Sequence, residues 1–214
     1  IQNLKKQHYI LSKSKLPNKT FKANDFKKSR IGVLVTCRLK STRLPQKALK
    51  RIGKFYSVEL CLNNCKKIKN INKVVLATSY LEEDQILVKK FKKKFNVFQG
   101  HPEDVIKRFL GVAKKYNLNT VIRVTADCPF VSPEILNFLI KKHYESGADY
   151  TAAKKFSVGT SGEVYNVEAM KNVMKKLKSA IHSEYMPWYF LNNNKYFKIN
   201  IVDLPKKLIR NHRL

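Results

Sequence analysis

Apolar residues along the chain gather in short continuous blocks, and longer amphipathic stretches separate these blocks. A continuous apolar run at 31–36 predicts a strand buried on both faces, 74–78 predicts a second buried strand, and 120–125 a further strand. Shorter strands are expected at 95–98, 148–152, 163–166 and 197–202. Helices are expected at about 58–68, from 82 onward, and at 102–116, 132–144, 167–178 and 183–192. This alternation predicts an α/β fold with a mostly parallel central sheet.

The first 29 residues are Lys-rich and polar, and they lack this periodicity. We interpret 1–29 as an N-terminal arm or the remnant of a preceding module, and 30–214 as one domain. The apolar fraction of 43% can fill the core of such a domain. No stretch approaches the roughly 18 uninterrupted apolar residues of a membrane-spanning helix, and residues 1–6 do not open a signal peptide. We therefore expect no membrane span and a cytoplasmic location.

The composition is strongly basic, with 44 Lys and Arg against 15 Asp and Glu and a net charge of +29. Such a balance hints at nucleic acid or phosphorylated ligands. However, 36 of these cations are Lys and only 8 are Arg, the residue that grips phosphates and guanine edges bidentately. The Lys runs at 89–94 and 175–178 fit solvated helix faces. We therefore expect no nucleic-acid partner, and keep a basic nucleic-acid-binding protein as the weaker alternative.

The cysteines give no indication of a metal centre. The four (Cys37, Cys61, Cys65 and Cys128) form no C-x-x-C pair, and no His cluster lies beside them in the sequence. Free thiols are therefore expected in place of a zinc site.

The loop after the first strand carries the most distinctive chemistry. Ligands of open α/β sheets bind in the crevice beyond the carboxyl ends of the strands. The loop 36–47 places four cations and two hydroxyls there, namely Arg38, Lys40, Ser41, Thr42, Arg43 and Lys47. Such a loop can wrap a triphosphate, because its cations neutralise the charge while hydroxyls and backbone N–H groups donate to the oxygens. An ordinary basic surface loop is the alternative. The glycine pattern of a Walker A loop is absent.

Asp127 is the second candidate, because it follows the buried strand 120–125 and faces the same crevice. Mg²⁺ in nucleotide enzymes is commonly held by one or two carboxylates together with phosphate oxygens, and this suits a lone Asp. A strand-capping Asp that bonds its own turn is the alternative.

Several sequence blocks together resemble a known family. They are TCRLKSTRLPQKAL (36–49), VVLAT (74–78), FQGHPEDVIKRF (98–109) and VIRVTADCP (121–129), followed by GTSGEV (159–164) and HSEYMP (182–187). Their order resembles the SpsF-like cytidylyltransferases, relatives of the CMP-sialic acid and CMP-Kdo synthetases. The resemblance implies the nucleotide-diphospho-sugar transferase fold, a Rossmann-like three-layer α/β sandwich. It implies transfer of CMP from CTP to a sugar-acid (nonulosonic-acid-type) or polyol acceptor, with release of pyrophosphate, in surface-polysaccharide biosynthesis.

The same resemblance implies roles for individual residues. CTP phosphates would be held by Arg38, Ser41, Thr42, Arg43 and Lys47, and Mg²⁺ by Asp127. Arg38, Lys47 and Asp127 would be the catalytic residues. Thr78, Gly100 and Asp104 would lie near the nucleotide. The acceptor would be faced by Glu163, His182, Glu184 and Tyr185.

The chain also departs from the family pattern. Lys40 and Gln46 stand where many relatives carry Gly. The family usually continues after an Arg-Leu pair into a strand with a second metal-binding Asp, whereas this sequence ends at Arg213-Leu214. We therefore expect 30–214 to lack its C-terminal end, and a catalytically impaired nucleotide-binding module of a larger protein is the alternative. Relatives are often homodimers through the late helical segment, although the cluster at 188–190 can equally belong to the core.

Overall fold

A seven-stranded sheet forms the centre of the molecule in the computed structural model, which describes residues 26, 28–40, 46–177 and 179–209. The strand order is β5-β4-β1-β6-β8-β7-β9. The strands are β1 Ile31–Thr36, β4 Lys73–Ser79, β5 Asn96–Gly100, β6 Thr120–Thr125, β7 Tyr150–Ala153, β8 Glu163–Asn166 and β9 Ile199–Val202. Only β8 runs against its neighbours β6 and β7. The predicted mostly parallel sheet is confirmed.

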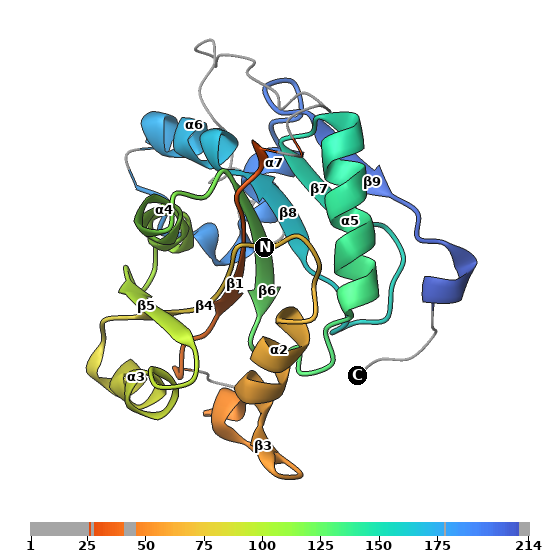
Figure 1. Ribbon diagram of the computed structural model, residues 1–214. Coiled ribbons are helices and arrows are strands. Elements are labelled where there is room, and N and C mark those ends of the chain that lie inside the picture. Colours follow the sequence, from red (N-terminus) through yellow and green to blue (C-terminus); the bar gives the residue numbers. More distant parts are fainter. Residues whose placement is uncertain (1–25, 27, 41–45, 178, 210–214) are drawn as a thin grey trace, which may run out of the picture.

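Helices cover both faces of this sheet and complete a three-layer sandwich (Figure 1). One face is covered by α2 Ser57–Cys65, α3 Gln85–Phe91 and α5 Pro133–Ser146. The other is covered by α4 Val105–Lys115, α6 Val167–Leu177 and α7 Pro187–Leu191. Short 3₁₀ turns include η2 Lys47–Leu49, η3 Glu82–Asp84 and η4 Ser183–Tyr185 between these elements and η5 Lys206–Leu208 after β9.

The two helical layers explain why the strands have continuous apolar sequences. On β1, Val33 and Val35 point to the layer of α2 and α5, whereas Leu34 between them points to the layer of α4 and α6. All three side chains are fully buried. Because both faces of β1 are covered, residues 31–35 show no alternation of apolar and polar positions.

Local sequence signals set the ends of α5 as expected. The hydroxyl of Ser132 accepts a hydrogen bond from the backbone N–H of Ile135 at 3.2 Å, and Pro133 occupies the first helical turn. The helix ends at Gly147, whose φ of 63° is the left-handed conformation that favours glycine.

Two parts of the structure differ from the sequence prediction. A small hairpin of β2 Arg51–Ile52 and β3 Phe55–Tyr56 lies where no strand was predicted, because its two-residue strands are too short to show a period. The single helix predicted at 183–192 is divided into η4 and α7, with Pro187 at the start of α7. Proline has no N–H to continue the preceding turn, so a new helix begins there.

The aromatic cluster in α7 belongs mainly to the core. Tyr189 and Phe190 are buried, and the ring of Phe190 stacks on Tyr150 of β7 at a centroid distance of 5.8 Å. Trp188 stays partly exposed. The homodimer through this segment stays a prediction.

Three further expectations concern the rest of the surface and the thiols. The cysteines are free, and the lysines of the 89–94 run are exposed, as predicted. In the part of the chain that the structure describes, no helix has the length and apolarity needed to cross a bilayer. Most of the predicted arm 1–29 lies outside the described residues, although Phe26 packs on Tyr144 of α5 at a ring distance of 4.8 Å.

Candidate nucleotide-binding site

The candidate site lies at one edge of the sheet, where the parallel strands end together. Thr36 at the end of β1 is in register with Ala77 of β4 and Thr125 of β6. The antiparallel strand β8 begins at the same edge, because Glu163 is in register with Arg123 of β6. The loops that follow β1 and β6 therefore leave the sheet side by side.

Lys47 and Asp127 meet over these strand ends. Lys47 opens the turn η2 after the β1 loop, Asp127 directly follows β6, and their side chains form an ion pair. The side chains remain 43% and 40% exposed, so a ligand can reach both groups. The expectation that the two strand-end loops bring a cation and a carboxylate together is thus confirmed.

Asp127 is held in its ionised form. Burial by itself would raise the pKa of this carboxyl, but hydrogen bonds from Lys47 and Thr125 and the charge of Lys47 outweigh it and lower the pKa below its ordinary value. A carboxylate that is ionised and exposed is a suitable oxygen ligand for a hard cation.

Arg38 connects the β1 loop to the loop after β5. Its Nη1 atom donates to the carbonyl oxygen of Pro102 at 2.8 Å and pairs with Oε1 of Glu103 at 2.7 Å. Glu103 is largely exposed, so this ion pair can be exchanged for a stronger anion at little cost. Arg38 thus holds a guanidinium at the same edge as Lys47.

The chemistry of this edge agrees with the comparison to known proteins. A family model described as Cytidylyltransferase matches residues 32–210. The chain belongs to the cytidylyltransferase family. It is therefore a nucleotidyltransferase by family, with the nucleotide-diphospho-sugar transferase fold predicted above.

Individual relatives agree with this assignment. The chain is 29% identical over 180 residues to the spore coat polysaccharide biosynthesis protein SpsF of Bacillus subtilis, covering 81% of this chain and 75% of that protein. Identity to 3-deoxy-manno-octulosonate cytidylyltransferase of Rickettsia akari is 25% over 146 residues, covering 63% of this chain and 57% of that protein. A cytidylyltransferase structure from Leptospira borgpetersenii superposes with a TM-score of 0.78 at 25% identity, covering 87% of this chain and 80% of that chain.

Asp84 fixes the start of the β1 loop of this cytidylyltransferase through buried hydrogen bonds. Acids at 82–84 suit the start of the helix expected from 82 onward, because the helix dipole favours negative charge there. Asp84 is instead 1% exposed and accepts hydrogen bonds from the N–H of Leu39 at 2.8 Å and from the N–H and hydroxyl of Ser79. It therefore fixes the start of the loop that carries Arg38.

Three residues predicted near the nucleotide lie at this edge but are buried or covered. Thr78 is fully buried near the end of β4, and its hydroxyl has no partner in the described structure. Gly100 ends β5 in close contact with Arg108. Asp104 uses its carboxylate within the protein, because it accepts from the N–H of Lys107 and the N–H of Ala180, each at 2.8 Å. Direct contact of these three residues with a nucleotide stays a prediction.

The acceptor-side residues fall into two separate groups. Glu163 pairs with Arg123 at 3.0 Å at the start of β8. Tyr185 and His182 are exposed in or next to η4, which is tied to the start of α4 because Ser183 accepts from the N–H of Val105 at 2.7 Å. Glu184 belongs to the same turn. The acceptor roles of these residues stay predictions.

Ser41, Thr42 and Arg43, predicted to bind the CTP phosphates, lie outside the residues that the structure describes. Their roles also stay predictions.

The described residues suit a metal ion that is bound together with a nucleotide better than one that is held by protein side chains alone. Within them, no group of three or more His, Cys, Asp or Glu side chains is arranged to hold a metal ion. Asp127 supplies one ionised carboxylate, and the remaining ligands of Mg²⁺ would come from phosphate oxygens and water.

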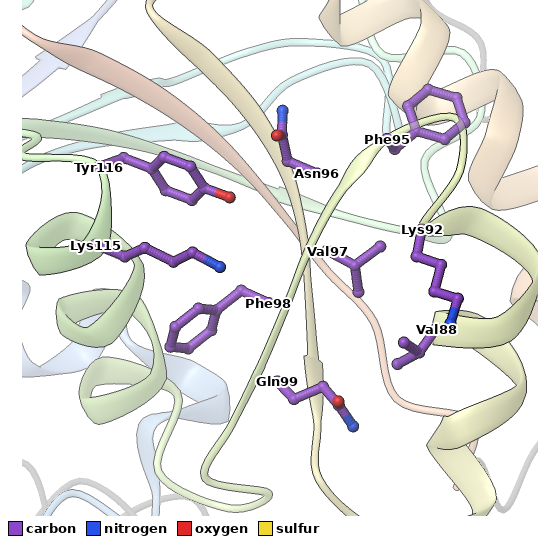
Figure 2. A pocket seen from close by; sticks show the side chains of 9 residues that line it. All are labelled: Val88, Lys92, Phe95, Asn96, Val97, Phe98, Gln99, Lys115 and Tyr116. Carbon is purple, nitrogen blue, oxygen red and sulfur yellow. The ribbon is translucent and has the colours of Figure 1, made fainter.

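A separate pocket lies against the edge strand β5 (Figure 2). Phe98, Lys115 and Tyr116 lie on one side of the strand, and Val88 and Lys92 on the other. None of the residues that line it belongs to the loops after β1 and β6, so it is distinct from the candidate nucleotide site.

Proposed function

We propose that this chain transfers CMP from CTP to a sugar-acid acceptor of the nonulosonic-acid type, with release of pyrophosphate, in the biosynthesis of a surface polysaccharide. The observation that carries the proposal is the meeting of Lys47 and Asp127 over the ends of β1 and β6 in a chain of the cytidylyltransferase family. A cation for phosphate oxygens and a carboxylate for their metal ion are the two groups that a metal-bound triphosphate requires.

The similarity to named relatives supports the acceptor class. One relative is a 3-deoxy-manno-octulosonate cytidylyltransferase, whose name states a sugar-acid acceptor, and another is a spore coat polysaccharide biosynthesis protein. The sequence also allowed a polyol acceptor, and the experiment below distinguishes it from a sugar acid.

The proposed reaction is a single in-line displacement. An acceptor hydroxyl oxygen forms a bond to the α-phosphorus, the bond from that phosphorus to the bridging oxygen breaks, and pyrophosphate leaves with the bonding electrons. The hydroxyl proton passes to solvent. No covalent enzyme intermediate is required, so catalysis rests on positioning and on stabilisation of charge.

Lys47 and Arg38 would supply that charge stabilisation. Both side chains are paired with carboxylates in the structure, Lys47 with Asp127 and Arg38 with Glu103. The phosphates of bound CTP would replace these carboxylates as partners of Lys47 and Arg38. Asp127 would then be free to bind Mg²⁺. Bound Mg²⁺ neutralises phosphate charge and orients the phosphate oxygens.

The test is a pyrophosphate-release assay with CTP, Mg²⁺ and a panel of nonulosonic acids, Kdo and polyol phosphates. UTP, ATP and GTP serve as controls for base choice. Lys47→Met should abolish release with the best acceptor, whereas the matched variant Lys50→Met, an exposed lysine three residues along, should retain it. Failure of every CTP and acceptor pair to release pyrophosphate would contradict the proposal.

A further inference from the structure

A buried arginine lies beneath the loop that carries Arg38. Arg108, on α4, is 1% exposed, although it belongs to an otherwise apolar face of the helix that contains Val105 and Phe109. The sequence block 98–109 contains it, but an arginine in a basic chain gives no reason to single it out.

Among the residues that the structure describes, all hydrogen-bond partners of the Arg108 guanidinium are neutral. Its Nη2 atom donates to the hydroxyl of Thr36 at 3.0 Å, and its Nη1 atom donates to the carbonyls of His101 at 3.1 Å and Pro102 at 3.5 Å. Its Nε atom is buried without a partner, and no carboxylate of the described residues forms an ion pair with it. A buried charge is usually paired, so this arrangement requires a reason.

Arg108 nevertheless remains charged at neutral pH. Burial, and then the charge of Arg38, lower the pKa of Arg108 to about 10, while Asp84 and Asp104 act in the opposite direction. Both of these carboxylates are bound elsewhere, Asp84 to Leu39 and Asp104 to α4. Arg108 thus has charged neighbours of both signs, but no carboxylate among the described residues pairs with it directly.

The hydrogen-bond partners of Arg108 lie next to Arg38 or also bind it. Thr36 lies two residues before Arg38, and the Pro102 carbonyl accepts from both guanidiniums, at 2.8 Å from Arg38 and at 3.5 Å from Arg108. Arg108 therefore ties the end of β1 to the turn after β5, and Arg38 lies across that junction.

Gly100 makes room for this arrangement. A Cβ atom at Gly100 would lie 2.8 Å from Cγ of Arg108 and 3.0 Å from Cε1 of Phe98. Contacts this short force a side chain to move, so any larger residue at 100 displaces the stem of Arg108. This close approach explains a glycine at the end of β5 without direct contact with a nucleotide.

We propose that Arg108 is a positioning residue for the nucleoside triphosphate: it fixes Arg38 toward the phosphates, and its buried charge strengthens their binding from behind. The proposal rests on the proposed function, because it requires CTP to bind at this edge. A bound triphosphate would balance the charge that the described residues leave unpaired. In a site of low dielectric, that charge acts strongly on the anion even without contact.

The test is calorimetric titration of the full chain with CTP, pyrophosphate and CMP in the presence of Mg²⁺. Arg108→Met should weaken binding of CTP and of pyrophosphate by about tenfold or more, the loss of a charged donor beside an anion. CMP should lose clearly less, because it lacks the β and γ phosphates. Arg108→Lys should restore part of the lost affinity.

Thr36→Val removes only the hydroxyl that accepts from Arg108, and it should weaken CTP binding a few-fold. This variant tests the positioning role of Arg108 if Arg108→Met does not fold.

Lys107→Met is the matched control, because it removes one charge from the exposed neighbouring position of α4. It should leave CTP affinity unchanged, and an equal loss would assign the effect to bulk charge and overturn the inference. Equal losses of CTP and CMP affinity in Arg108→Met would also overturn it. So would unchanged CTP affinity in both Arg108→Met and Thr36→Val, provided that the wild type binds CTP. A wild type that does not bind CTP contradicts the proposed function itself.

Discussion

Arg108 is buried and Arg123 is mostly buried near the same edge of the sheet, and their charges have different partners. Arg123, on β6, donates from Nη1 to both carboxylate oxygens of Glu163, at 3.0 and 3.3 Å. Arg108 has one hydroxyl and two carbonyls as partners. Arg123 therefore has a direct carboxylate partner beside β8, whereas Arg108 has none among the described residues beside β1. This difference is what the proposed role of Arg108 toward a bound anion rests on.

The pKa values of the two guanidiniums follow the same division. Burial by itself would lower the pKa of Arg123, but Glu163 reverses this effect and the pKa lies above its ordinary value. Burial, followed by the charge of Arg38, lowers the pKa of Arg108 to about 10, and Asp84 and Asp104 offset this only in part. Arg123 is thus paired with a carboxylate inside the protein. Arg108 has no such partner among the described residues, and we propose that its charge acts on a bound ligand.

The largest expected effect is on the β1 side. Lys47→Met should lower kcat/KM for CTP by a factor on the order of 100 or more, because it removes a cation that would stabilise the charge on the triphosphate as pyrophosphate leaves. The free energy of unfolding should change by less than about 1 kcal/mol, since the Lys47–Asp127 pair is exposed. Steady-state kinetics and urea denaturation provide the two numbers. A large loss of stability would mean that the pair serves the fold.

The reverse is expected on the β8 side. Glu163→Gln should lower the free energy of unfolding by about 2–3 kcal/mol, because it removes the carboxylate that pairs with the charge of Arg123. The loss is less than for a fully buried pair, since both side chains keep some exposure to solvent. Urea denaturation measures this loss. The double variant Arg123→Met, Glu163→Gln should recover part of it. If Arg108→Met costs more stability than Glu163→Gln, the distinction between the two arginines is wrong.

A smaller effect is expected from crowding Arg108. Gly100→Ala should cost about 1–3 kcal/mol of stability through overpacking and should also weaken CTP binding. Gly53→Ala is the control, because Gly53 has a φ of +58° with open space around it. Its substitution should cost about 1 kcal/mol through backbone strain alone. Loss of CTP affinity in Gly53→Ala but not in Gly100→Ala would contradict the packing argument.

The smallest effect is expected from the lysine run after α3. Neutral substitution of Lys92 and Lys93, which are exposed, should leave CTP affinity within experimental error. Exposed charges more than about 10 Å from a ligand are largely screened at physiological salt. Fluorescence or calorimetric titration at constant ionic strength tests this. A loss comparable to that of Lys47→Met would favour bulk charge over the strand-end site.

The fold could be predicted from the sequence because its signals are local. The strand β1 is a continuous apolar run, and α5 begins at a Ser-Pro pair and ends at Gly147. The hairpin at 51–56 was missed because its strands are too short to show a period.

The site was predicted only where residues lie in strand-end loops. Arg38, Lys47 and Asp127 were found because the carboxyl edge of a parallel sheet is where loops converge. Asp84 and Arg108 were not, because their partners are distant in sequence: Leu39 is 45 residues from Asp84, and Thr36 is 72 residues from Arg108. Buried polar contacts of this kind depend on tertiary packing, which leaves no period in the sequence.

The most direct test of the account is the dependence of CTP binding on Mg²⁺ in the wild type and in Asp127→Asn. The account predicts that Mg²⁺ strengthens CTP binding to the wild type and has little effect on the folded variant, because the variant lacks the carboxylate that would hold the ion. Mg²⁺-dependent affinity that is retained in Asp127→Asn would contradict a metal–triphosphate site over the ends of β1 and β6.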